Sequence, residues 1–102
     1  MSNPKSVTTE AWLNRWIDEI HRSNVVPITH ARYSRIIQRH FNPSIGHIAL
    51  GELTIRDLGQ TCEQVSDALA TPAEAYRILR AALVSAVENG VIDHNVAGQG
   101  AL

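Results

Sequence analysis

The chain has 102 residues, enough for one domain with a single hydrophobic core that needs neither disulfides nor a structural metal. Apolar residues make up 44% of it and charged residues 19%, a globular balance that argues against disorder. The formal charge of −1 excludes nucleic-acid binding through overall positive charge, so any such affinity must come from the local placement of basic residues.

Residues 1–7 are polar and contain a proline, which predicts a flexible N-terminal segment. A first helix is predicted to begin at Thr8 or Thr9, either of which can cap it, and to end at Ser23 and Asn24. One side of this helix is apolar over two turns, through Trp12, Leu13, Trp16, Ile17 and Ile20.

A second helix is predicted from a cap at Thr29 to about Phe41, because Asn42 and Pro43 are expected to stop it. The residues expected to face the core are Tyr33, Ile36, Ile37 and Phe41. Gly46 then permits a turn. The turn leads into a loop that we expect to be held on the core by Ile48, Leu50 and Leu53.

Thr54 is predicted to open a third helix, with Asp57 placed as the acidic partner of a capping box. The apolar stripe of this helix has alternating spacings of three and four residues, through Ile55, Leu58, Cys62, Val65 and Leu69.

The stretch Thr71-Pro72-Ala73-Glu74 combines a cap, a proline at the first helical position and a glutamate at the third, and predicts a fourth helix to Glu88. Its buried side is predicted to hold Ala75, Tyr76, Leu79, Ala82, Leu83, Ala86 and Val87. Asn89-Gly90 is a stop signal in which Gly90 takes the left-handed conformation, and Val91 and Ile92 are expected to fold back after it. No segment has a strand pattern, so the sequence predicts an all-α domain of four helices.

Catalytic chemistry is not indicated. The five histidines show neither HExxH spacing nor an acidic cluster, so we expect no metal, no cofactor and no catalytic residue. Cys62 lies on an apolar stripe, which favours a buried small hydrophobe over a nucleophile, and a lone cysteine suits a reducing cytoplasm. No apolar run approaches the roughly 20 residues that span a bilayer, and the N-terminus lacks a signal-peptide core. We therefore expect a soluble cytoplasmic domain without a membrane partner.

Arginine dominates the basic residues, and guanidinium groups suit bidentate contacts with phosphates or guanine edges. Arg32, Arg35 and Arg39 fall within roughly 60° of one another beside the core side of the second helix. No acid lies three or four residues from them to pair with their charge. Thr29 and His30 are expected to add polar groups and free backbone N–H donors at the helix start. A merely solvated face is the alternative, and the spacing leaves it open.

The polar side of the fourth helix carries Arg77 and Arg80, beside the small residues Ala81 and Val84 that allow close approach by a large partner. The acids are expected to gather elsewhere, at Asp18, Glu19, Glu52, Glu63 and Asp67. This predicts a polarised surface with a DNA-facing side. A helical protein–protein interaction module that does not bind DNA is the alternative interpretation.

The motifs follow in the order WLNRWIDEI, a Pro-Ile-Thr helix start with Tyr33, RHFNPSIGHIALGELT and TPAEAYRILRAALVSAVENGVIDHN. In this order and spacing, over residues 8–97, the chain resembles the core-binding domain of tyrosine recombinases of the phage integrase family. The resemblance implies a SAM-like, orthogonal four-helix bundle that clamps one face of double-stranded DNA at the crossover site during integration and recombination in a bacterial host cell. Residues 98–102 would begin the linker to a catalytic domain.

In the family, helices that look like the second and fourth here lie toward the major groove, which selects the two arginine-bearing helices. The DNA contacts implied are Thr29, His30, Arg32, Arg35, Arg39, Arg77 and Arg80. The partners implied are a C-terminal catalytic domain and other recombinase protomers. The family's Arg/His/Arg/Tyr catalytic set belongs to that absent domain, so Tyr33 and Tyr76, both expected on core faces, are not its nucleophile. The chain also departs from the family's Asn-Pro at this end, with Asn95-Val96.

Overall fold

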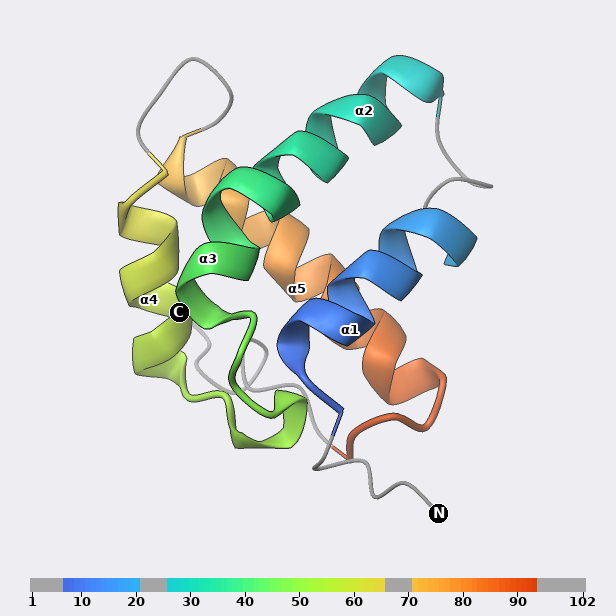
Figure 1. Ribbon diagram of the computed structural model, residues 1–102, viewed down its shortest axis with the longest axis vertical. Coiled ribbons are helices and arrows are strands. Elements are labelled where there is room, and N and C mark those ends of the chain that lie inside the picture. Colours follow the sequence, from blue (N-terminus) through green and yellow to red (C-terminus); the bar gives the residue numbers. More distant parts are fainter. Residues whose placement is uncertain (1–6, 21–25, 66–70, 94–102) are drawn as a thin grey trace.

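The computed structural model describes residues 7–20, 26–65 and 71–93. Within these ranges the chain forms four helical segments and no strand, with one isolated bridge between Thr8 and Ala49. The elements, drawn in Figure 1, are α1 (Thr9–Arg15) continued by η2 (Trp16–Ile20), α2 (Pro27–Ile36) continued by η4 (Ile37–Phe41) and α3 (Asn42–Ile45), η5 (Leu50–Glu52), α4 (Ile55–Glu63) and α5 (Pro72–Glu88). The predicted all-α, four-helix architecture is confirmed.

Two predictions concern residues outside these ranges, namely the end of the first helix at 23–24 and the linker at 98–102. Val7, the last residue of the predicted flexible segment, is held on the connector before α4, because its carbonyl accepts a hydrogen bond from the Leu50 N–H at 2.7 Å. None of the helices in the described part of the chain is long and apolar enough to cross a membrane.

The N-terminus of α1 is held by the connector between α3 and α4. Of the two predicted candidates, Thr8 is the cap, and its hydroxyl accepts a hydrogen bond from the Ala11 N–H at 3.1 Å. The connector provides acceptors for the first two N–H groups of α1. Thr9 N–H donates to the Ile48 carbonyl at 2.8 Å, and Glu10 N–H donates to the Gly46 carbonyl at 3.0 Å. A helix start normally leaves such donors without a partner inside the helix. Here they tie α1 to a segment almost forty residues further along the chain.

The second helix begins at Pro27, two residues earlier than the predicted cap at Thr29. Val26 takes the extended N-cap conformation, and its carbonyl accepts the N–H groups of both Thr29 and His30 at 3.1 Å. The cause is Pro27, whose fixed φ suits the first helical position and whose missing N–H costs nothing there.

The predicted stop at Asn42 and Pro43 is also wrong, since the helical path continues to Ile45. A π-turn, η4, precedes it, in which Asn42 N–H donates to the carbonyl of Ile37 five residues back. This change of register places Pro43 in the first turn of α3. In a first turn a proline removes no intrahelical hydrogen bond, so it does not break the helix.

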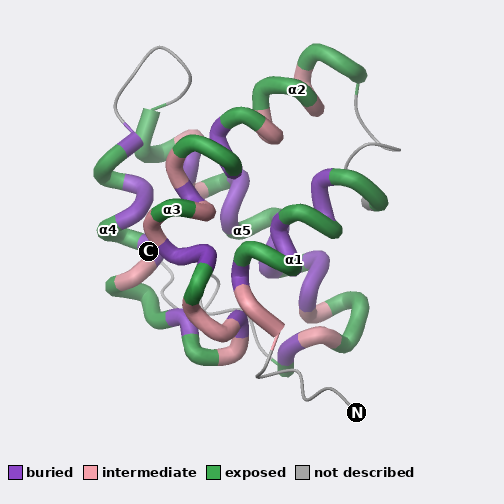
Figure 2. The backbone as a smooth tube through the Cα atoms, in the orientation of Figure 1, coloured by how far each residue is buried: buried purple, intermediate pink, exposed green. Residues whose placement is uncertain are grey.

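Helix α5 forms the back of the bundle and touches each of the other main helices (Figure 1). Its contact with α1 includes a buried hydrogen bond from Trp12 Nε1 to the Ala82 carbonyl at 2.8 Å. Figure 2 shows the buried positions on the inward sides of the helices and of the connector. The largest fully buried side chains are Trp12, Phe41, Leu13, Ile36, Ile37, Leu58, Ile78, Leu79 and Leu83.

The predicted core differs from this in a few places. Ile55 is 45% exposed, because it occupies the first position of α4 at the outer end of the stripe. Ile78 and Ser85 are buried although we did not assign them to the core. Tyr33, Tyr76 and Val87 are only partly buried and pack against the core from its edge. Ile20 and Leu69 lie where no side chain is described.

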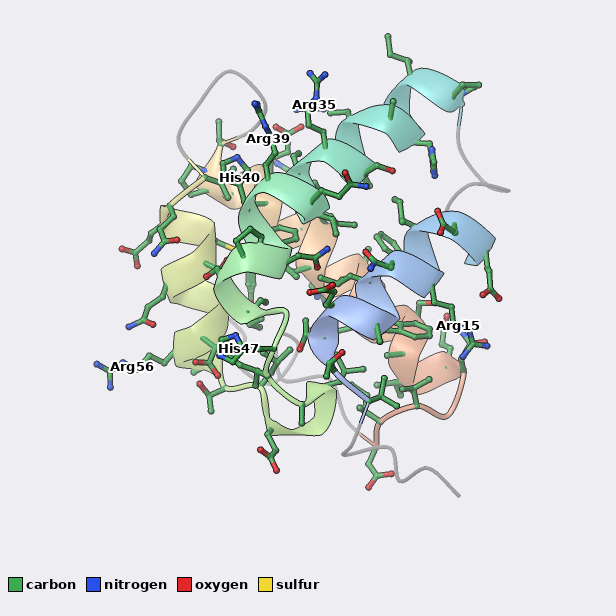
Figure 3. All side chains as sticks on the ribbon, in the orientation of Figure 1. Arg15, Arg35, Arg39, His40, His47 and Arg56 are labelled. Atoms are coloured by element: carbon green, nitrogen blue, oxygen red, sulfur yellow. The ribbon has the colours of Figure 1, made fainter. Side chains whose placement is uncertain are left out.

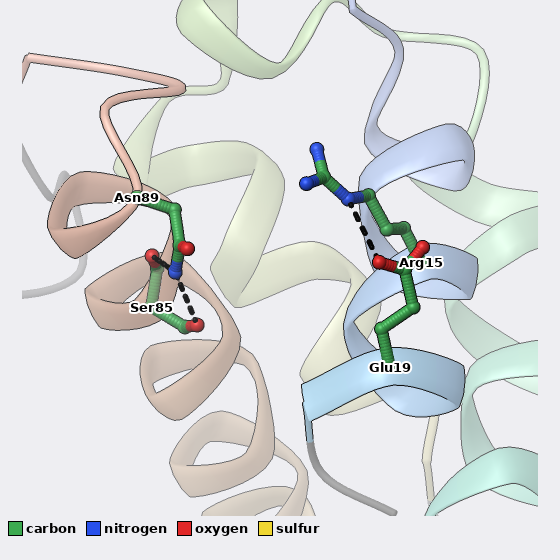
Figure 4. A network of polar contacts seen from close by, with 4 residues as sticks. All are labelled: Arg15, Glu19, Ser85 and Asn89. Carbon is green, nitrogen blue, oxygen red and sulfur yellow. Dashed lines mark hydrogen bonds and ion pairs between the residues drawn. The ribbon is translucent and has the colours of Figure 1, made fainter.

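The predicted caps of the last two helices are confirmed. Thr54 and Asp57 form a reciprocal capping box at α4, and the Thr71 hydroxyl accepts the Glu74 N–H at 3.2 Å at α5. Gly90 has a φ of +72°, and Val91 N–H donates to the Ala86 carbonyl at 2.8 Å, so α5 ends in the left-handed turn that glycine favours. Asn89 also turns back and donates through its side chain to the Ser85 carbonyl (Figure 4).

Gly46 is tested by replacement with alanine. A Cβ there would lie 2.4 Å from the Asn42 carbonyl oxygen and 3.0 Å from Glu10 Cβ, so the connector would have to move away from α1. We expect Gly46→Ala to lower the free energy of unfolding by about 1–3 kcal/mol, measured by urea denaturation.

The matched control is Gly59→Ala in α4, where a new Cβ meets nothing within 4 Å. Because it removes a glycine from a helix interior, this change should raise stability by about 0.5–1 kcal/mol. Equal effects of the two substitutions would contradict the close approach at Gly46.

Cys62 is buried as predicted, with 5% of its surface exposed. Burial raises the pKa of its thiol from 9.0 to about 11, because the low-dielectric surroundings disfavour the thiolate.

At pH 8 we expect the folded protein to react with iodoacetamide about a hundredfold more slowly than the urea-unfolded chain. Because this pKa is higher in the folded state than in the unfolded chain, the thiol lowers the stability of the fold as the pH rises from 9 to about 11. Below pH 9 it has no such effect. Equal alkylation rates in the two states would refute this placement.

Candidate nucleic-acid interface

Arg35 and Arg39 are exposed residues of the second helical segment, one in α2 and the other in η4. Figure 3 shows both side chains pointing away from the bundle at the same end of the molecule. Their neighbours Ile36 and Ile37 are completely buried, so the backbone that carries the two arginines is anchored in the core. Two cations therefore project into solvent from a rigid support.

Arg32, the third member of the predicted stripe, has a partner that we did not foresee. Its Nη2 lies 2.5 Å from Oε2 of Glu74, at the start of α5. We had examined only acids three or four residues away on the same helix, whereas Glu74 lies 42 residues further along the chain. The expectation that the charge of Arg32 is not cancelled locally is thus wrong.

Glu74 lies under the influence of two of the predicted arginines. The hydrogen bond from Arg32 is the largest cause that lowers the pKa of its carboxyl group, and the charge of Arg77 acts in the same direction. One arginine of the second helix therefore contacts this carboxylate, and one arginine of the fourth helix acts on it through its charge. This also corrects the predicted segregation of charge, because an acid lies inside the basic surface.

Arg77 and Arg80 are exposed on α5, as expected for its polar side. Ala81 is exposed too, and Val84 keeps 39% of its surface accessible, so small residues do flank the arginines. The structure thus pairs Arg32 with Glu74, and it places Arg77 one helical turn from Glu74 on α5. The side chains of Arg35, Arg39 and Arg80 are exposed on α2, η4 and α5, respectively.

Thr29 and His30 differ from the sequence expectation. Their N–H groups are not free, since both donate to the Val26 carbonyl inside the first turn. His30 is half-buried, and its Nε2 lies 3.0 Å from the Ile17 carbonyl, so the ring links α2 to η2. The start of α2 therefore offers a phosphate less than we predicted, because two of its donors are already used.

An apolar group that the sequence did not lead us to expect lies beside the arginines. Ile28 is 79% exposed and Val26 60% exposed at the start of α2. A hollow in the surface is lined by Ile28, Ala31, Arg32 and Arg35. These positions follow the i, i+3, i+4, i+7 spacing of one helix face. That spacing was visible in the sequence, but we had scored this side of the helix for charge only.

The other two described arginines are arranged differently. Arg15 lies 5.7 Å from the centre of the Trp12 ring and pairs with Glu19 at 3.5 Å on its own helical segment (Figure 4). Arg56 projects from α4, well away from Arg35 and Arg39 (Figure 3). Among the described residues no group of three or more His, Cys, Asp or Glu side chains could hold a metal ion. Tyr33 and Tyr76 pack against the core, as expected.

Comparison with known proteins gives a consistent result. The chain resembles the solution NMR structure of a phage integrase SAM-like domain from Moorella thermoacetica, with a TM-score of 0.68 and 24% sequence identity. The similarity covers 97% of this chain and 87% of that one, and it establishes the SAM-like fold. No curated protein matches the chain. The sequence profile of the phage integrase N-terminal SAM-like domain matches residues 8–62, more than half of the chain. The chain therefore belongs to the phage integrase N-terminal SAM-like domain family.

Proposed function

We propose that this chain is the core-binding domain of a phage-integrase-type tyrosine recombinase, and that it clamps duplex DNA at the crossover site. The observation that carries the proposal is the placement of exposed arginines on α2, η4 and α5 in a chain of this family. The proposed contacts are Arg35, Arg39, Arg77 and Arg80, with Arg32 at the junction of the two helices and Thr29 and His30 as secondary contacts.

Electrostatics supports phosphate contact over base reading as the main source of affinity. Guanidinium groups bind phosphate oxygens through two parallel hydrogen bonds, and each contact releases counterions from the DNA. The domain as a whole carries a formal charge of −1, so repulsion by its acids offsets part of this attraction. Binding by this domain in isolation should therefore be weak and strongly dependent on salt.

The same proposal assigns the domain to residues 8–97 and the start of an interdomain linker to 98–102. A following catalytic domain would close the other face of the duplex, and further protomers would bind the partner sites. In this proposal the core-binding domain holds and positions the duplex, while the catalytic domain cleaves the DNA backbone. That division agrees with the family match, which concerns an N-terminal SAM-like domain.

A protein–protein interaction module is the second candidate, and the exposed apolar patch favours it. Ile28 is 79% exposed and lines a hollow with Arg32 and Arg35, and Val26 is 60% exposed at the start of the same helix. Exposed apolar groups rimmed by charge are common at protein interfaces. The two functions differ in the partner they require, so titration with DNA separates them.

We expect the domain to bind labelled duplex DNA with an affinity that falls steeply with salt. Three to five phosphate contacts predict a slope of log K against log salt concentration of about −3 to −4.5. Arg35→Ala and Arg39→Ala should each make the slope less negative by about 0.9, because each removes one phosphate contact. Fluorescence anisotropy at several salt concentrations measures both quantities.

The matched control is Arg56→Ala, which removes the same charge from α4 on a different part of the surface. It should leave the slope nearly unchanged, and all three variants should keep the unfolding temperature of the parent. Absence of binding even at low salt, or equal effects of the three substitutions, would count against the DNA-binding function. Amide shifts on α4 instead of α2 and α5 would favour the protein-interaction candidate.

A further inference from the structure

We propose that Glu74 is an internal competitor of DNA, whose carboxylate occupies Arg32 and opposes phosphate at Arg77, and so limits the affinity of the arginine surface. This inference rests on the proposed function and adds a residue that restrains it. It follows from the position of one acid among arginines contributed by two helices.

The Arg32–Glu74 pair is accessible from solvent. The side chain of Arg32 is 43% exposed and that of Glu74 30% exposed, so an incoming ligand can reach both. Exposed ion pairs contribute little to folding stability, because water already solvates the separated charges. An acid in the first turn also stabilises α5 modestly through the helix dipole. The ion pair with Arg32 is not needed for that effect.

The carboxylate of Glu74 is directed away from its own helix. At the equivalent third position of α4, the side chain of Asp57 accepts the Thr54 N–H and completes the capping box. The Glu74 side chain instead binds Arg32 of α2, while the cap of α5 is made by Thr71. The two arginines lower the pKa of Glu74, so the carboxylate stays ionised well below neutral pH.

A phosphate that approaches this point meets two obstacles. Arg32 must leave the carboxylate or share its N–H donors with it, and the carboxylate repels the phosphate at Arg77. A unit charge several ångströms from a bound phosphate, in a water-like dielectric, changes the affinity about threefold. If Arg32 becomes available, it adds one phosphate contact, which makes the salt slope more negative by about 0.9.

The test is Glu74→Gln, which keeps the length of the side chain and removes its charge. Binding of labelled duplex DNA should tighten about threefold or more at low salt, and the salt slope should become more negative by about 0.9. The unfolding temperature serves as the readout of a purely structural role. Looser binding together with a lower unfolding temperature would overturn the inference.

The matched control is Glu52→Gln in η5, which makes the same change of net charge at the opposite end of the molecule from α2 (Figure 1). A gain equal to that of Glu74→Gln would show a general charge effect and overturn the inference. The gain from Glu74→Gln should shrink when it is combined with Arg32→Ala. An undiminished gain in that background would overturn the competition for Arg32.

Arg39→Ala separates this inference from the proposed function. If Arg39→Ala weakens binding while Glu74→Gln leaves it unchanged, the inference about Glu74 fails and DNA binding stands. If neither the parent domain nor any variant binds duplex DNA at low salt, the proposed function fails and the inference fails with it.

Discussion

The docking of the connector onto the start of α1 is the constraint on which the rest of the bundle depends. The carbonyls of Gly46 and Ile48 satisfy the first two N–H groups of α1, and the Val7 carbonyl accepts the Leu50 N–H in return. Buried or partly buried donors must find partners, so this exchange holds the connector firmly. Gly46 makes it possible, since any side chain there would collide with Glu10 and the backbone of Asn42.

From this junction the chain leaves in two directions, and both reach the arginine surface. The segment that precedes the connector is the continuous helical run of α2, η4 and α3, which carries Arg35 and Arg39. Toward the C-terminal side, Leu50 and Leu53 are buried and lead into α4, which packs on α5. The Trp12–Ala82 hydrogen bond then ties α5 back to α1. The surface arginines thus stand on helices whose mutual position is determined by buried contacts.

The surface that carries the arginines of α2, η4 and α5 is not uniformly basic, because it also contains an acid. Arginines suit phosphate, yet Glu74 pairs with Arg32 and the whole chain is slightly acidic. Under the proposed function, weak individual contacts suit this domain, because linked domains would supply the remaining affinity through effective concentration. Strong binding by one domain would slow its release from incorrect sites.

Local signals in the sequence were enough for the helix number, the caps at Thr8, Thr54 and Thr71, the left-handed Gly90 and most of the core. These features depend on residues a few positions apart, whose preferences act before any tertiary contact forms. The pairing of Arg32 with Glu74, the π-turn that admits Pro43 and the inward bond of His30 were not predictable in that way. The Arg32–Glu74 pair and the His30–Ile17 contact join segments 42 and 13 residues apart, and only the folded chain brings those atoms within bonding distance. The π-turn is local, but the 3.6-residue period of a helix does not reveal a hydrogen bond to the fifth residue back.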